Sequence, residues 1–206
     1  SVDRILNAFS TVENVKKMNL EDGANIIGIH MEGPFFSDEY KGAQNPDFLQ
    51  YGSIENLDKL IGNHWDILKI LTFAPERVDE EVIQKLKDKN VIAAMGHTGA
   101  DNALVEKSNL LGASHVVHLY NGMKGLHHRE PGTAGAVLSN DKIYAELILD
   151  GIHVHPKMAE IAYKCKGDKL ILITDSMKAA GLQDGKYDLG GQDVFVQGSE
   201  ARLANG

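Results

Sequence analysis

Six short apolar runs recur along the chain, and segments with a helical spacing of apolar residues separate them. Several runs are apolar at nearly every position, which is typical of parallel strands buried on both faces rather than of strands with one solvated face. The pattern therefore predicts an α/β fold with six β/α units. The predicted strands cover residues 25–31, 68–73, 91–95, 113–117, 143–149 and 169–174.

Helical periodicity is clear in residues 79–89, where apolar residues share one face and acidic residues occupy the first turn. The other predicted helices cover residues 3–18, 100–111 and 156–165. After Gly185 the chain changes to strand fragments punctuated by glycine, which predict a β-hairpin. We therefore expect an α/β domain over residues 1–184 and a separate β segment over residues 185–206.

The chain is acidic, since its 206 residues carry a formal net charge of −8 at pH 7. That balance argues against nucleic acid or an anionic membrane as the main partner, so an anionic ligand would need a local pocket. The single cysteine, Cys165, excludes an intramolecular disulfide. No apolar run approaches the ~20 residues of a membrane-spanning helix, and no secretory signal pattern opens the sequence. We expect a cytoplasmic protein.

Ionisable side chains follow five of the predicted strands at or just beyond the point where each strand ends. Because the carboxyl ends of parallel strands meet at one edge of a sheet or one mouth of a barrel, we expect these side chains to face a common site. They are Glu32, His97, His118, His153 and Asp175.

Glu32, His97 and His118 have the composition of an open catalytic metal site, with one oxygen and two nitrogen ligands and one coordination position left for water. A single histidine is more often a surface or hydrogen-bonded core residue, so the prediction rests on the joint position of the three. His115 lies on the opposite face of its strand from His118, and we place it outside the site. His64 has the sequence context of a structural residue.

Asp175 follows a run that would be buried, so its carboxylate is expected at the rim of the site. There it could take a proton from a water activated by the metal and return that proton to a leaving group. The alternative is a helix N-cap, a position that aspartate favours.

One segment combines an Asn-Gly turn with an arginine. The turn N–H groups of Asn121 and Gly122 and the planar guanidinium of Arg129 suit a phosphate, although an arginine is more often a solvated surface residue. One of His153 and His155 is expected to contact substrate. Motifs typical of dinucleotide-binding proteins, P-loop proteins, zincins and serine hydrolases do not occur. The residues alone predict a metal-assisted hydrolase with an anion pocket.

Five motifs stand in order along the chain: GIHMEGPFFS (28–37), MGHTGAD (95–101), HLYNGM with LHHREPG (118–132), ELILDGIHVHP (146–156) and LITDSMKAAGL (172–182). Together they closely resemble the N-acetylglucosamine-6-phosphate deacetylases of the amidohydrolase superfamily. The resemblance implies a (β/α)8 TIM barrel with a small β-sandwich. It also implies a role in amino-sugar metabolism. The implied reaction is the metal-dependent hydrolysis of the acetamide of N-acetylglucosamine 6-phosphate to glucosamine 6-phosphate and acetate.

The resemblance also implies roles for the residues at the strand ends. It makes Glu32, His97 and His118 the ligands of a divalent metal ion, with zinc and iron as the leading candidates. Asp175 corresponds to the general base and acid. His153 resembles a residue that binds the sugar near the scissile amide.

A second group of residues is implied to bind the rest of the substrate. Asn121 and Gly122 resemble the backbone cradle for the phosphate. Arg129 resembles the phosphate-binding arginine, which the neighbouring subunit can supply in the family's homodimers. Gln44 stands where many members have histidine, so it is a candidate substrate contact that departs from the family pattern.

The His-x-His segment of the family's first barrel strand has no counterpart before Asn25. The six predicted strands match the family's third to eighth, so we expect a fragment that lacks the first barrel strands and the end of the chain. Its first and last strands would be unpaired edges, since only closure of a barrel removes them. Whether one or two metal ions bind stays open without the first strand.

Two other functions stay open at this point. A truncated barrel could persist as an inactive fragment or as a non-catalytic module that binds sugar phosphates. Alternatively, the substrate could be N-acetylgalactosamine 6-phosphate, because the sequence does not reveal which ring hydroxyls are recognised.

Overall fold

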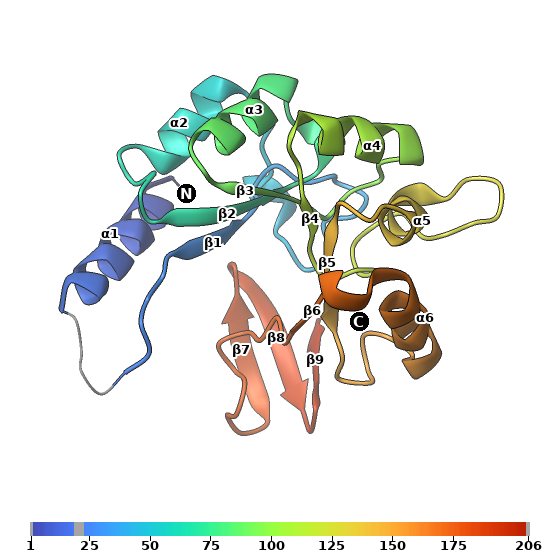
Figure 1. The fold of residues 1–206 in the computed structure, drawn as a ribbon. Coiled ribbons are helices and arrows are strands. Elements are labelled where there is room, and N and C mark those ends of the chain that lie inside the picture. Colours follow the sequence, from blue (N-terminus) through green and yellow to red (C-terminus); the bar gives the residue numbers. More distant parts are fainter. Residues whose placement is uncertain (1, 19–22, 205–206) are drawn as a thin grey trace.

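The computed structural model describes residues 2–18 and 23–204 of the chain. Its main feature is a six-stranded parallel sheet that curls into an incomplete barrel, in which the strand order follows the chain (Figure 1). The strands are β1 (Ile29–Glu32), β2 (Leu68–Phe73), β3 (Ile92–Met95), β4 (His115–Val116), β5 (Tyr144–Ile148) and β6 (Leu170–Ile173). This arrangement confirms the predicted α/β class and the incomplete TIM barrel.

Helices lie on the outer side of this arc (Figure 1). They are α1 (Val2–Met18), α2 (Ile54–Ile61), α3 (Glu80–Asp88), α4 (Asn102–Leu111), α5 (Gly132–Ser139) and α6 (Pro156–Lys166), with the short 3₁₀ helices η1 (Pro46–Phe48), η2 (Pro75–Arg77) and η3 (Gly167–Lys169). Local sequence sets several helix starts. Asp101 caps α4 by accepting the backbone N–H of Leu104 at 2.9 Å. This cap fixes the end of the loop that runs from β3 into α4.

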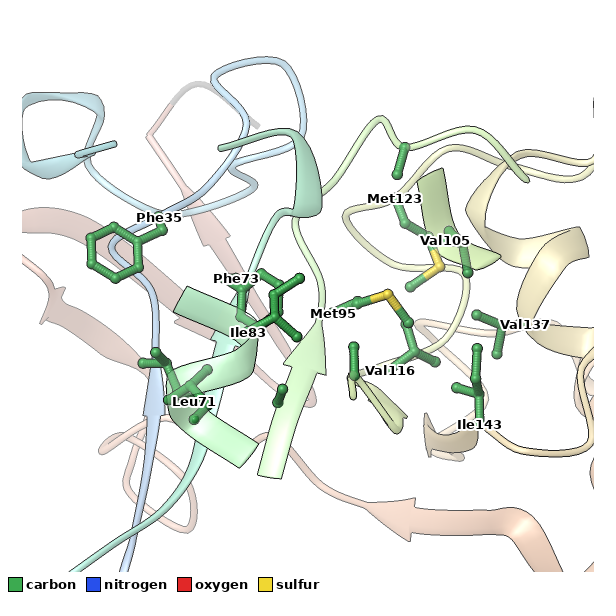
Figure 2. Close-up of a cluster of buried hydrophobic side chains, with 14 of the residues drawn as sticks. Phe35, Leu71, Phe73, Ile83, Met95, Val105, Val116, Met123, Val137 and Ile143 are labelled. Carbon is green, nitrogen blue, oxygen red and sulfur yellow. The ribbon is translucent and has the colours of Figure 1, made fainter. Parts of the chain in front are cut away.

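The core lies between the sheet and these helices. Figure 2 shows Met95 of β3 and Val116 of β4 beside Val105 of α4 and Val137 of α5. All four side chains have 0% exposure. Burial of each such side chain contributes about 1.5–3 kcal/mol, so this layer holds the loops after β3 and β4 against a fixed support.

Two helices are not predicted by the apolar periodicity. For α2 a signal exists, since Ser53 accepts the N–H of Asn56 at 3.2 Å and the buried Leu57 and Leu60 share a face. For α5 the signal is missing, because its residues are small or apolar on every side and are buried from Gly132 to Leu138. A helix that is buried all round has no polar face for a periodicity to reveal.

The first strand begins later than predicted. It starts at Ile29 rather than at residue 25, and its register with β2 shifts between Ile29 and His30. Ile27 is 77% exposed, so the apolar residues before β1 are not buried by the sheet. Among the described strands, β1 and β6 each have one neighbour, as expected for the two edges of an open barrel.

The last part of the chain forms a separate antiparallel sheet of β7 (Gly185–Leu189), β8 (Gln192–Gln197) and β9 (Glu200–Leu203). It contains the predicted hairpin and one further strand. The side chain of Gln192 donates to the carbonyl of Ala43 at 2.6 Å, which ties this sheet to the loop that follows β1. None of the helices in the described part of the chain is long and apolar enough to cross a membrane.

Candidate metal centre

Three of the predicted site residues meet at the carboxyl edge of the sheet. Glu32 ends β1, and His97 and His118 each lie two residues beyond the ends of β3 and β4. The Nε2 atoms of both histidines lie 3.0 Å from the same carboxylate oxygen, Glu32 Oε1. The three potential ligand atoms all lie within 4.8 Å of one another.

Backbone carbonyls determine which imidazole nitrogen faces the centre. Nδ1 of His97 donates to the carbonyl of Tyr40 at 2.9 Å, and Nδ1 of His118 donates to the carbonyl of Asn121 at 3.0 Å. Each Nε2 is therefore the atom that takes up either a proton or a metal ion. Outer partners of this kind orient the histidine ligands of metal sites, so the donor set fits a divalent cation.

The backbone is strained at three of the predicted site residues. His97, His118 and Asp175 have φ values of 49°, 29° and 51°, in the left-handed region that residues with a side chain seldom adopt. Such conformations cost of order 1–3 kcal/mol each and persist only where surrounding contacts fix them. Their coincidence with strand ends that carry ionisable groups supports a functional reading of the cluster.

The cluster also changes the pKa of its members. Burial alone would raise the pKa of Glu32, but hydrogen bonds from His118 and His97 outweigh burial and hold it well below its ordinary value. Burial alone would lower the pKa of His118, but the bond to Glu32 raises it above its ordinary value. In the metal-free chain the Glu32 carboxylate favours a proton on His118, and a divalent cation would compete with that proton for Nε2.

Asp175 lies two residues beyond β6 and lines a cavity of about 710 Å³ together with Glu32 and His118. The negative charge of Asp175 is one of the influences that raise the pKa of His118. Within the described residues only a turn at 178–181 separates Asp175 from β7, so a helix-capping role is excluded. Asp175 therefore lines the same cavity as two of the three candidate metal ligands, Glu32 and His118.

Known proteins that are similar to this chain are deacetylases. No family model matches the chain. The N-acetylglucosamine-6-phosphate deacetylase of Bacillus subtilis is 49% identical over 186 residues, which are 89% of this chain and 47% of that protein. The crystal structure of the deacetylase from Thermotoga maritima superimposes with a TM-score of 0.91 at 33% identity, over 100% of this chain and 55% of the other. The chain is a homologue of the N-acetylglucosamine-6-phosphate deacetylases.

This homologue spans about half the length of the curated deacetylases that it matches. A structure of the Mycobacterium smegmatis deacetylase, in which an aspartate is replaced by alanine, contains N-acetyl-D-glucosamine-6-phosphate. It superimposes on this chain with a TM-score of 0.91 at 32% identity, over 100% of this chain and 53% of that protein. An N-acetylgalactosamine-6-phosphate deacetylase of Escherichia coli O157:H7 is also similar, at 40% identity over 89% of this chain and 49% of that protein.

The predicted substrate residues of the deacetylase homologue are more scattered than its candidate ligands. Asn121 and Gly122 lie beside the centre, where Gly122 has a φ of 57° and a Cβ there would lie 3.0 Å from Nδ1 of His97. Gln44 is half-buried in the loop after β1. Arg129 is exposed on the loop that projects before α5 (Figure 1), and it is not among the residues that line the cavity.

His153 lies on the loop after β5, outside the cavity lining. Its Nδ1 lies 2.6 Å from Oδ2 of Asp150, and its backbone N–H donates to Oδ1 of the same residue. That backbone bond is the main cause that lowers the pKa of Asp150 to about 2. His155 accepts the N–H of Lys157 at 3.1 Å at the start of α6, so of the two histidines it is the one with a capping role.

Sequence reasoning missed two features of the deacetylase homologue's site. The carbonyl of Tyr40, which orients His97, belongs to the backbone and has no signature in a sequence. Glu146 is buried in the cavity wall, and burial raises its pKa. A lone carboxylate inside an apolar strand was a usable signal for Glu146, because a buried carboxylate without a partner is costly.

The Glu32–His118 pair predicts a pH-dependent contribution to stability in the metal-free chain. The raised pKa of His118 in the folded state stabilises the fold below pH 6.5, which is the pKa in the unfolded state. This stabilisation is lost as the pH rises through the folded-state pKa. The lowered pKa of Glu32 in the folded state stabilises the fold above pH 4.5, which is the pKa in the unfolded state. This stabilisation is lost as the pH falls below that value. The free-energy difference between wild type and His118→Gln, from urea unfolding in EDTA, should therefore be largest between these values and shrink above 6.5.

His115→Gln is the matched control for this measurement. Burial lowers the pKa of His115, so the difference between wild type and this variant should grow as pH rises toward 6.5 and level off above it. A His118→Gln difference that stays constant, or that follows the His115→Gln curve, would contradict the assigned pairing.

Proposed function

We propose that the chain carries the metal centre of a deacetylase that hydrolyses the acetamide of N-acetylglucosamine 6-phosphate. The supporting observation is the convergence of two imidazole Nε2 atoms on one oxygen of Glu32, each at 3.0 Å. We assign Glu32, His97 and His118 as ligands of at least one divalent ion. Zinc and iron both suit one carboxylate and two imidazoles.

A divalent cation at this centre supplies a Lewis acid for the amide oxygen and lowers the pKa of a water molecule. Asp175 accepts a proton from the attacking water and delivers it to the departing amine nitrogen. This role requires a carboxylate close to the metal ligands, and Asp175 lines the same cavity as Glu32 and His118.

The remaining assignments concern the sugar phosphate. Asn121 and Gly122 form the backbone part of the phosphate site, and His153 and Gln44 contact the sugar. Arg129 supplies a cation to the phosphate from the neighbouring subunit of a homodimer, which its exposed position on a projecting loop permits. We assign the reaction to the cytoplasm, where sugar phosphates are metabolised.

The test is to incubate the purified chain with Zn²⁺ or Fe²⁺ and N-acetylglucosamine 6-phosphate and to measure the free amine. We expect release that requires both the metal ion and the 6-phosphate, with the unphosphorylated sugar as the control. Faster release from N-acetylgalactosamine 6-phosphate would favour the epimer, which the similarity to a galactosamine-type deacetylase makes a real alternative. Binding of the sugar phosphate without release would favour a non-catalytic module.

A further inference from the structure

A carboxylate from a third loop supports the segment that carries His97. Glu76 lies in η2, directly after β2. Its Oε2 accepts the hydroxyl of Thr98 at 2.5 Å, and its Oε1 accepts the backbone N–H of Gly99 at 2.7 Å. Both partners immediately follow His97, and both bonds are charge-assisted, the stronger class of hydrogen bond.

Thr98 joins the loops of both candidate histidine ligands. It is 0% exposed, and its hydroxyl accepts the N–H of Ala100 at 2.9 Å. Its backbone N–H donates to the carbonyl of Gly122 at 3.0 Å, and its carbonyl accepts the N–H of Lys124 at 2.9 Å. The loop after β3 is thereby paired with the loop after β4, and Glu76 connects this pair to the loop after β2.

His97 needs this support because its backbone has a positive φ. The carbonyl of His97 accepts the N–H of Ser37 at 3.0 Å. The next two residues, Thr98 and Gly99, are held by Glu76. A strained conformation persists only while its neighbours fix it, so release of the Thr98–Gly99 segment allows the ring of His97 to turn away from Glu32.

We infer that Glu76 is a positioning residue for the metal centre and acts through Thr98 on His97. Glu76 is exposed and bonds to Thr98 and Gly99 rather than to a candidate ligand, so its effect on His97 passes through this segment. The inference rests on the proposed metal site. It adds that the affinity of this site depends on a carboxylate outside it.

The test compares Zn²⁺ dissociation constants of the full chain and of Glu76→Gln, by competition with a chromophoric chelator. Glutamine keeps the shape and one acceptor but loses the charge, and we expect about tenfold weaker binding, the scale found for groups that orient metal ligands. Glu55→Gln is the matched control, because Glu55 is an exposed carboxylate paired with Lys59 on α2. It should leave the dissociation constant unchanged.

Substitutions of Thr98 separate positioning from general stability. Thr98→Ser keeps the hydroxyl and should retain the wild-type affinity, whereas Thr98→Val should weaken binding. Glu76→Gln should weaken binding less in the Thr98→Val background than in the wild type, because the Thr98 bond is already lost there and only the Gly99 N–H bond to Glu76 remains. The visible spectrum of bound Co²⁺ should weaken in Glu76→Gln and keep its wild-type shape in Thr98→Ser, a difference that a general loss of stability would not produce.

The outcomes distinguish this inference from the proposed function. If the wild-type chain binds Zn²⁺ and Glu76→Gln binds equally well, the positioning role is wrong and the metal site stands. The role is equally wrong if Glu55→Gln weakens binding as much as Glu76→Gln does. If the wild-type chain binds no Zn²⁺, both the metal site and the role of Glu76 are overturned.

Discussion

Glu32→Gln is expected to weaken Zn²⁺ binding at least ~100-fold, the largest effect on metal affinity of any change to this chain. Glu32 supplies the one negative charge of the three-residue cluster, and its Oε1 lies 3.0 Å from both imidazole Nε2 atoms. Glutamine preserves the size of the side chain but removes the charge that attracts a divalent cation. Competition with a chromophoric chelator would measure the affinity.

The control for Glu32→Gln is Glu39→Gln, which neutralises an exposed carboxylate on the loop that follows β1. Its Zn²⁺ affinity should equal that of the wild type. Equal affinities for Glu32→Gln and the wild type would mean that any bound metal ion lies elsewhere on the chain.

Asp175→Asn is expected to reduce acetate release by about 10²- to 10⁴-fold, the range for loss of a general acid–base group. Asparagine keeps the shape but cannot take up the proton of the attacking water. Because Asp175 is outside the three-residue ligand cluster, Zn²⁺ affinity should stay within about threefold of wild type. Steady-state assay of the released amine and metal titration of the same preparation would measure both quantities.

Asp168→Asn provides the comparison for Asp175→Asn, since Asp168 is exposed and lies in η3, before the opposite end of β6. It should leave both turnover and metal affinity unchanged. Loss of Zn²⁺ binding in Asp175→Asn would make Asp175 a metal ligand, and retained turnover would exclude it as the general base.

The strands could be predicted because a parallel sheet buried on both faces leaves continuous apolar runs, and β2 matches its run at both ends. The start of β1 could not be predicted, since Ile27 is exposed although it is apolar, and pairing with β2 decides where the strand begins. Helix α5 could not be predicted either, because it is buried on all sides and has no polar face to produce a helical periodicity.

The meeting of Glu32 with His97 and His118 followed from residue type and topology together, because parallel strands bring their carboxyl ends to one edge. Finer features depend on atoms that a sequence does not specify. The carbonyl of Tyr40 that orients His97 and the positive φ of Asp175 both arise from the path of the folded backbone. Sequence therefore indicated which groups meet, and the fold determined which atoms they present.

The gap between β1 and β6 changes the electrostatic surroundings of the centre. His30 on β1 lines the cavity and is exposed, so bulk water reaches the inside of the barrel from the side as well as from the mouth. A higher local dielectric weakens the attraction between Glu32 and a cation at any given distance. A polypeptide that filled the gap would strengthen this attraction by drying the lumen, without contacting a single ligand.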